Sequence, residues 1–153
     1  MISAAKCAVG GLMLITIGLP AAGSAQNRWA RQVHDELQRA LNVVHAHGGD
    51  RPLLDKEGTL NQEESASFTI TLREGVSYSI FGVCDEDCSR LRLVLATLAN
   101  SELALDRTSE GFPVLQFTPR VTAEYRIRVA MEECRLNPCW YAAGVIPSSG
   151  AKP

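Results

Sequence analysis

The amino-acid sequence predicts an antiparallel β-sandwich preceded by one amphipathic α-helix. Near the N-terminus, apolar residues recur at steps of three and four, which is the period of a helix face. From residue 67 onward, apolar residues alternate with polar ones in short segments, which is the pattern of half-buried strands. Two close-set pairs of cysteines lie among those segments. Together these observations indicate a mainly β domain with one added helix.

Residues 1–25 have the three parts of a secretory signal peptide. Lys6 precedes an apolar run from Cys7 to Leu19, and Pro20 is followed by small residues that end at Ala25. The apolar run is shorter than the roughly 20 residues that a membrane-spanning helix needs, so we expect a cleaved signal. These features predict a periplasmic or secreted protein that is not embedded in a membrane after cleavage.

Residues 26–49 are expected to form the amphipathic helix. Asn27 is a suitable N-cap, and Gly48 and Gly49 give a stop signal. The apolar stripe of this helix consists of Trp29, Val33, Leu37, Leu41 and Val44. The stripe either packs on the rest of the domain or binds a partner, including a second copy of the chain in a homodimer. Residues 48–65 are rich in Gly, Asp, Glu and Pro, and within them residues 50–65 are expected to form an irregular linker.

Seven short strands are expected within residues 66–146. The alternating segments lie at residues 68–72, 76–81, 91–95, 103–105, 114–117, 125–129 and 140–145. Arg73, Glu74 and Gly75 separate the first two segments and are expected to join them in a hairpin. Short strands that are half polar throughout are typical of an antiparallel sandwich. Residues 147–153 are expected to be a disordered tail.

Four cysteines remain once Cys7 leaves with the signal, and they are Cys84, Cys88, Cys134 and Cys139. An even number of cysteines in an oxidising compartment predicts disulfides. Four cysteines allow three pairings, and the sequence does not choose among them. We favour local pairing, because each close-set pair resembles a clamp on a single loop. A zinc site is disfavoured, because the ligand spacing is wider than in zinc ribbons and export favours oxidation.

The charge of the chain argues against a nucleic-acid partner. The sequence has 15 Lys and Arg against 17 Asp and Glu, which gives a net charge of −2. Removal of the signal deletes Lys6 and no acidic residue, so 14 cations and a net charge of −3 remain. Nucleic-acid-binding domains are usually strongly basic, and this chain is not.

Several motifs together resemble the bacterial pre-peptidase C-terminal domain. They are the segments 72–78, 84–88, 91–95, 117–119, 124–129 and 134–141, so the similarity covers about residues 60–146. The resemblance implies a β-sandwich with jelly-roll-like topology, in a stand-alone exported form. It also implies a non-catalytic accessory role in which the domain binds matrix polymers or calcium. The sequence departs from the family at Arg90 and Arg92, because family members commonly carry acidic residues in this strand.

The sequence predicts no enzyme. His34, His45 and His47 lie on or just after the predicted helix, and no histidine falls in the predicted sandwich. No Gly-x-Ser-x-Gly or His-Glu-x-x-His motif occurs. We therefore expect a binding or structural accessory role in the cell envelope. The alternative is a small hydrolase-associated factor, or an enzyme that uses one of the helix histidines.

The first cysteine loop contains the candidate metal ligands. Asp85, Glu86 and Asp87 place three carboxylates between Cys84 and Cys88, and calcium takes hard oxygen ligands of this kind. Adjacent side chains do not all converge on one point, so other loops would have to contribute ligands. Calcium is the one cofactor that the sequence suggests.

Three further residues are candidates for binding a partner. Alternation sends Trp140 and Tyr141 to opposite faces of their strand, so we expect one of them in the core, and Trp140 is the candidate aromatic contact. Arg126 and Arg128 form an outward-facing basic pair that suits an acidic polymer. The expected partner is an unidentified protein or an envelope polymer.

Overall fold

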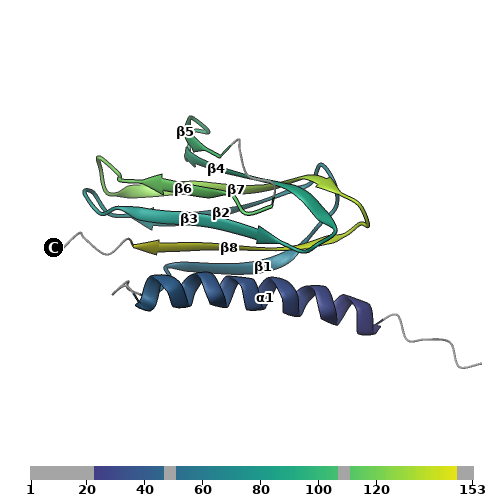
Figure 1. Ribbon diagram of the computed structural model, residues 1–153. Coiled ribbons are helices and arrows are strands. Elements are labelled where there is room, and N and C mark those ends of the chain that lie inside the picture. The colour runs from purple at the N-terminus through teal and green to yellow at the C-terminus, as the bar shows by residue number, and fades with distance from the viewer. Residues whose placement is uncertain (1–22, 47–50, 107–110, 148–153) are drawn as a thin grey trace, which may run out of the picture.

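The protein forms three layers, which are one helix and two four-stranded antiparallel sheets (Figure 1). The computed structural model describes residues 23–46, 51–106 and 111–147, and within the helix it describes the side chains of residues 28–43. The first sheet has the order β1 (Leu54–Leu60), β8 (Cys139–Pro147), β3 (Tyr78–Cys84) and β6 (Val114–Phe117). The second has the order β2 (Ser65–Leu72), β7 (Ala123–Cys134), β4 (Cys88–Thr97) and β5 (Glu102–Leu105). The expected fold class, a β-sandwich with one helix, is confirmed.

Most strands pair with a partner that is distant in sequence. Apart from β4 and β5, hydrogen-bonded neighbours are not consecutive, because the chain crosses between the two sheets. Such crossing connections occur in jelly-roll sandwiches. The longest ladders join β7 to β2 and to β4, so β7 forms the centre of the second sheet.

Two hydrophobic cores hold the layers together. The larger core lies between the sheets, where alternate residues of each strand point inward, among them Tyr78, Leu93 and Ile127. The smaller core lies between the first sheet and the helix. Strands β3 and β8 are buried on both faces because they lie between these two cores, which explains why their sequences are nearly continuous apolar runs.

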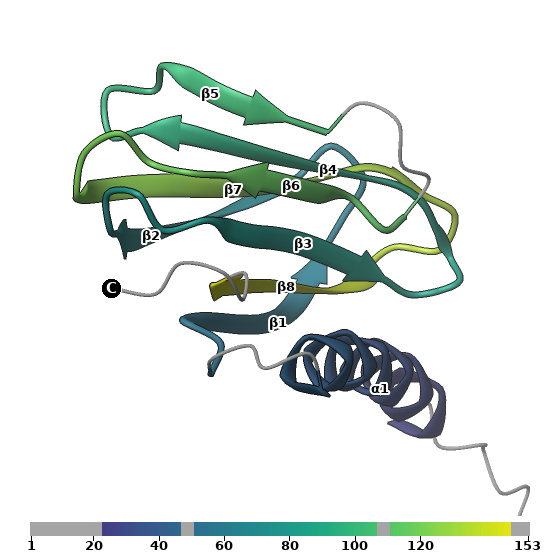
Figure 2. The ribbon, with the colours of Figure 1, turned by 60° about the vertical axis from the view of Figure 1, so that its left-hand side comes forward.

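The helix α1 (Gly23–Ala46) covers the outer face of the first sheet (Figure 2). Its fully buried residues Val33 and Leu37 pack against Phe81, Val83 and Ile146. The apolar stripe therefore packs on the domain itself, and the alternative in which that stripe forms a homodimer has no support. The helix begins three residues before the expected start and ends at Ala46. None of the described helices is both long and apolar enough to cross a membrane.

The hairpin predicted at residues 73–75 is wrong. Strand β2 belongs to the second sheet and β3 to the first, so the turn crosses between layers and does not pair its two flanking strands. The turn is anchored to the segment before β7, because Gly75 N donates to Pro119 O and Glu74 N donates to Thr122 Oγ1. Alternation identified both strands, but it carries no information about which layer each strand joins.

The predicted linker at 50–65 contains a strand. Residues Leu54–Leu60 form β1, which pairs along its whole length with β8, and Ser65 already begins β2. The structure therefore has eight strands in its described part, where seven were predicted. The sequence of β1 has only leucines at its ends and polar or glycine residues between them, because β1 is an edge strand with most of its side chains exposed. Residues of these types are depleted in strands, which hid the element. Residues 1–22 of the expected signal peptide (1–25) and residues 148–153 of the expected tail (147–153) lie outside the described residues.

Replacement of Gly144 by alanine should loosen the contact between helix and sheet. A Cβ atom at Gly144 would lie 2.4 Å from Cζ of Phe81, whose ring covers the glycine on the side of the helix. Because the core around Phe81 is closed by the helix, we expect Gly144→Ala to lower the free energy of unfolding by about 1–3 kcal/mol. Urea denaturation measures this change.

A double-mutant cycle shows whether the clash with Phe81 causes the destabilisation by Gly144→Ala. The smaller side chain in Phe81→Leu should absorb the added methyl group, so Gly144→Ala should destabilise Phe81→Leu less than it destabilises the parent. Equal destabilisation in both backgrounds would contradict this account of the contact.

Candidate binding surface at the disulfide end of the sandwich

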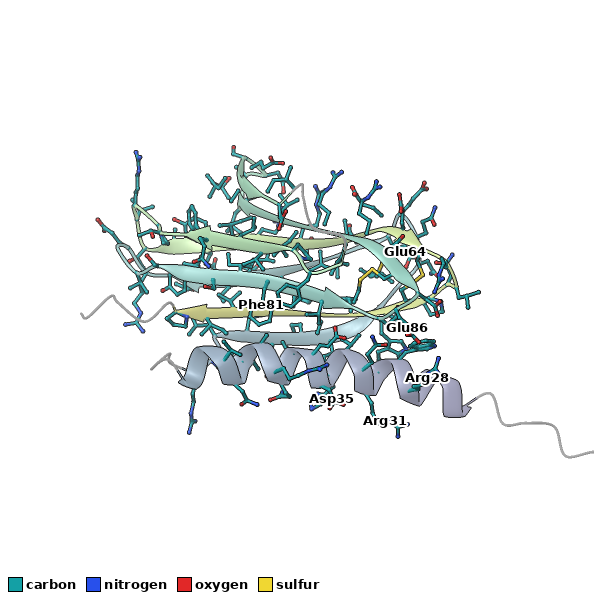
Figure 3. All side chains as sticks on the ribbon, viewed as in Figure 1. Arg28, Arg31, Asp35, Glu64, Phe81 and Glu86 are labelled. Carbon is teal, nitrogen blue, oxygen red and sulfur yellow. A yellow bond between two sulfur atoms is a disulfide. The ribbon has the colours of Figure 1, made fainter. Side chains whose placement is uncertain are left out.

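Two disulfide-closed loops lie side by side at one end of the sandwich (Figure 3). Cys84 pairs with Cys88 between β3 and β4, and Cys134 pairs with Cys139 between β7 and β8. The pairing is local, and the Cα atoms are 5.9 Å apart in each bridge. Cys88 and Cys134 are directly opposite each other in the β4–β7 ladder, which brings the two loops together.

Asp85 joins the first loop to the start of β8. Its side chain is buried, with a relative exposure of 2% for the residue. Oδ1 accepts hydrogen bonds from the backbone N–H groups of Asp87 (3.1 Å) and Cys88 (3.2 Å), and Oδ2 accepts one from Trp140 N (2.7 Å). The backbone N–H of Asp85 also donates to Trp140 O (3.1 Å). One buried carboxylate thus fixes both its own loop and the backbone of Trp140.

Burial and hydrogen bonding shift the pKa of Asp85 in opposite directions. Burial raises the pKa of this carboxyl above its ordinary value of 3.8, and the nearby charge of Asp87 adds to the rise. The backbone donors of Trp140, Asp87 and Cys88 stabilise the charged form and offset part of the increase in pKa. The net effect is an elevated pKa, with burial as its largest cause.

Arg135 joins the second loop to the first. Its Nη2 donates to Asp87 Oδ1 (3.0 Å) and to Glu86 O (3.1 Å), and its backbone N–H donates to Asp87 O (2.8 Å). The other side of the second loop is held by Asn137, whose Oδ1 accepts a hydrogen bond from Gln62 N (2.8 Å). Contacts on both sides therefore restrain the loop that Cys134 and Cys139 close.

The three predicted calcium ligands have different partners. Asp85 points to backbone donors, Asp87 to Arg135, and the exposed Glu86 to Arg28 on the helix, at 3.3 Å. Within the described residues, no group of three His, Cys, Asp or Glu side chains is placed to hold a metal ion. The calcium site stays a prediction, and the described geometry does not support it.

A groove of about 370 Å³ opens beside the second loop, between the helix and the first sheet. It is lined by Trp29, Thr59, Asp87, Leu136, Asn137, Pro138 and Trp140. The side chain of Arg28 pairs with Glu86 (Figure 3). Its guanidinium also lies 4.0 Å from the ring centre of Trp29, which restrains this tryptophan at the groove. Leu136 is 68% exposed, the highest exposure among the large apolar residues described.

Sequence reasoning found one tryptophan of this groove and missed the other. Trp140 was a candidate, and the structure places it at the outer face of the first sheet while Tyr141 is buried in the inner core. Trp29 was assigned only to the apolar stripe of the helix. Leu136 was not among the candidates, although an apolar side chain inside a disulfide-closed loop is a usable sequence signal for an exposed contact.

The two arginine candidates lie on the opposite layer of the molecule. Arg126 and Arg128 belong to β7 and line a groove of about 390 Å³ with Ser67, Val94, Ala96, Asn100 and Glu102. Trp140 and the arginine pair are therefore separate surfaces and do not form one site. Arg90 and Arg92, where the sequence departs from the resembled family, are ion-paired with Glu133 and Glu132 respectively.

His34 makes a contact that ties the helix to the edge strand β1. Its Nδ1 lies 2.8 Å from Oε1 of Glu57, and both groups are at least partly exposed. Within the described residues this carboxylate is its one polar partner. The side chain of His45 and the whole of His47 lie outside the described residues.

Comparisons with known proteins identify no family. No protein-family model matches the chain, and no curated protein matches it. Nine chains of solved structures match, and one is PliG from Aeromonas hydrophila, a periplasmic lysozyme inhibitor of g-type lysozyme. That match has 12% sequence identity and a TM-score of 0.42, and covers 60% of this chain and 84% of that chain. At this level of similarity we draw no functional conclusion from it.

Loss of the Asp85 carboxylate should strongly destabilise the protein. Asp85→Ala leaves the backbone donors of Asp87, Cys88 and Trp140 without their acceptor in a buried position. We expect a loss of about 2–4 kcal/mol in the free energy of unfolding at neutral pH, measured in urea with the disulfides intact. The matched control Glu86→Gln removes an exposed charge from the same loop and should change stability by less than about 1 kcal/mol.

The pH dependence of stability should reveal the elevated pKa of Asp85. A carboxyl with a raised pKa in the folded state binds its proton more tightly than in the unfolded state, so stability falls as pH rises from 3.8 through the folded pKa. Asp85→Asn does not titrate, so the wild type should lose stability relative to this variant across that range. A relative gain with rising pH would show that the backbone donors outweigh burial.

Proposed function

We propose that this chain is a non-catalytic exported protein that binds a protein partner through the surface at its disulfide end. We call this the loop-end surface and define it as Trp29, Leu136, Asn137, Pro138 and Trp140. The observation that carries the proposal is the exposure of Leu136, at 68%, on a loop that the Cys134–Cys139 disulfide closes. Single exposed leucines are common on protein surfaces, but a closed loop holds this one beside the groove that Trp29 and Trp140 line, and this setting suits an interface.

Restraint of the loop favours binding. A mobile loop loses conformational freedom when it docks, and this loss weakens the complex. Here the loop is restrained by a disulfide, by Arg135 bound to the first loop, and by Asn137 bound to Gln62 N. Leu136 is therefore presented in a fixed position beside a groove with an aromatic wall. Tryptophan side chains with polar groups at their margin are typical of a protein-binding hot spot.

The wider setting of the proposal is the cell envelope. The signal-like residues 1–25 and the two disulfides support an exported protein. The motifs that resemble the pre-peptidase C-terminal domain support an accessory module, and we include this stand-alone form in the proposal. A binding role also agrees with His34, whose ring nitrogen contacts a carboxylate and, among the residues described, no nucleophile.

Substitution of Leu136 tests the proposal directly. Tagged mature protein is used to capture partners from an envelope extract of the cells that produce it, and the partner is then purified for calorimetry. We expect Leu136→Asp to weaken the complex by about 10- to 100-fold, because a charge replaces the apolar anchor. Since the side chain is exposed, the melting temperature should stay within about 2 °C of the wild type.

The matched control is Val121→Asp. Val121 is also an exposed apolar residue, at 58%, but it lies in the segment before β7 and outside the groove at the disulfide end. This variant should bind as the wild type does. Equal binding by Leu136→Asp and wild type would remove the loop-end surface from the interaction, and equal loss in both variants would indicate a non-specific apolar contact.

A further inference from the structure

The outer face of the second sheet carries a groove that the proposed function does not use. It is lined by Ser67, Val94, Ala96, Asn100, Glu102, Arg126 and Arg128, and we call it the arginine groove. The helix lies against the other sheet, so among the described elements none packs over this face (Figure 2). The groove and the loop-end surface share no residue.

Strand register places the groove residues in two rows across the sheet. Arg128 of β7 is opposite Ser67 of β2 and Val94 of β4. In the next row, Arg126 is opposite Ala96, which in turn is opposite Glu102 of β5. The two arginines are two residues apart on one strand, so their Cα atoms are separated by roughly 7 Å and their side chains leave the same face.

Among the residues that the structure describes, no acidic side chain forms an ion pair with either of these two arginines. On the same face, Arg90 and Arg92 pair with glutamates. Arg126 donates a hydrogen bond to the neutral side-chain oxygen of Asn100, which orients the guanidinium without compensating its charge. Arg128 has no ion pair or hydrogen bond to any part of the chain that the structure describes. Guanidinium groups of this kind bind carboxylates through paired hydrogen bonds.

The other residues that line the arginine groove indicate which class of ligand fits it. Val94 and Ala96 form an apolar floor, while Ser67 and Asn100 supply polar groups. Glu102 lies in the same groove without an ion pair to either arginine, so its carboxylate is an acceptor there. An inorganic polyphosphate has no hydroxyl group to donate to this carboxylate and would only be repelled by it. A sugar has an apolar face for the floor, and its hydroxyl groups donate hydrogen bonds to carboxylates.

We propose that the arginine groove binds an acidic glycan, a sugar chain that bears carboxylates. Arg126 and Arg128 bind the carboxylates of the glycan, and Glu102 accepts hydrogen bonds from its hydroxyl groups. The sugar rings lie over Val94 and Ala96. This site is independent of the proposed protein-binding surface, because it lies on the other sheet and uses other residues.

Calorimetry with defined oligosaccharides tests the proposal on the mature, oxidised protein. The probes are tetragalacturonate, its fully methyl-esterified form, and inorganic polyphosphate. We expect tetragalacturonate to bind, and the ester, which keeps the hydroxyl groups but loses the charges, to bind at least about tenfold more weakly. Failure of tetragalacturonate to bind at millimolar concentration, or tighter binding of polyphosphate, would overturn the proposal.

Three variants show whether Arg126 and Arg128 form a specific site or whether the positive charge of this face attracts any anion. Arg126→Gln/Arg128→Gln should weaken binding of tetragalacturonate by at least about tenfold, and Arg128→Gln alone should weaken it severalfold without disturbing a contact of the fold. Arg90→Gln/Arg92→Gln removes the same number of charges from the same face and should bind within about twofold of wild type. Equal losses in the two double variants would contradict a specific site.

The variant Glu102→Ala distinguishes recognition of a glycan through its hydroxyl groups from recognition of any polyanion through its charge. If Glu102 accepts hydroxyl hydrogen bonds, its removal weakens binding of tetragalacturonate severalfold. If the ligand is recognised only by its negative charge, removal of an acidic residue strengthens binding. Stronger binding by Glu102→Ala would therefore overturn the assignment of the ligand.

Discussion

The buried carboxylate of Asp85 is the interaction on which the disulfide end of this protein depends. A single side chain accepts three backbone hydrogen bonds and so ties the β3–β4 loop to the first residues of β8. Without it, three backbone N–H groups would lose their acceptor, and only backbone contacts such as that from Asp85 N to Trp140 O would join the loop to β8. Through Asp87 and Arg135 the second loop is then fixed to the first. The two disulfide-closed loops, which are distant in sequence, thereby form one rigid surface with Leu136 at its edge.

The helix completes this surface through apolar burial. Val33 and Leu37 are fully buried against the first sheet, and each contributes about 1.5–3 kcal/mol. The ion pair between Arg28 and Glu86 is more than half exposed on both sides, so water and salt screen it and it adds at most about 1 kcal/mol. Burial therefore holds the helix in place, whereas Arg28 fixes the local position of Trp29.

The sequence predicts elements better than it predicts their partners. The helix and most strands follow from periodicity, since each apolar pattern reflects a buried face. Strand β1 was missed because an edge strand with exposed side chains has no such pattern, and the hairpin at Gly75 was wrong because a turn between layers resembles a turn within a sheet. The candidate residues Trp140, Arg126 and Arg128 were found by residue type, but their separation onto opposite layers required the strand order. The contribution of Trp29 depends on helix packing, which no local pattern encodes.

Amide hydrogen exchange tests most directly whether the disulfide end is held rigid by Asp85. The N–H groups of Cys88 and Trp140 donate to this carboxylate, and the central strand β7 supplies reference amides from the core. The account predicts that both amides exchange within about tenfold of the slowest amides of β7, because they open only when the sandwich unfolds. Exchange faster by about a hundredfold or more would show that the loops open independently, and would contradict a preformed surface at this end.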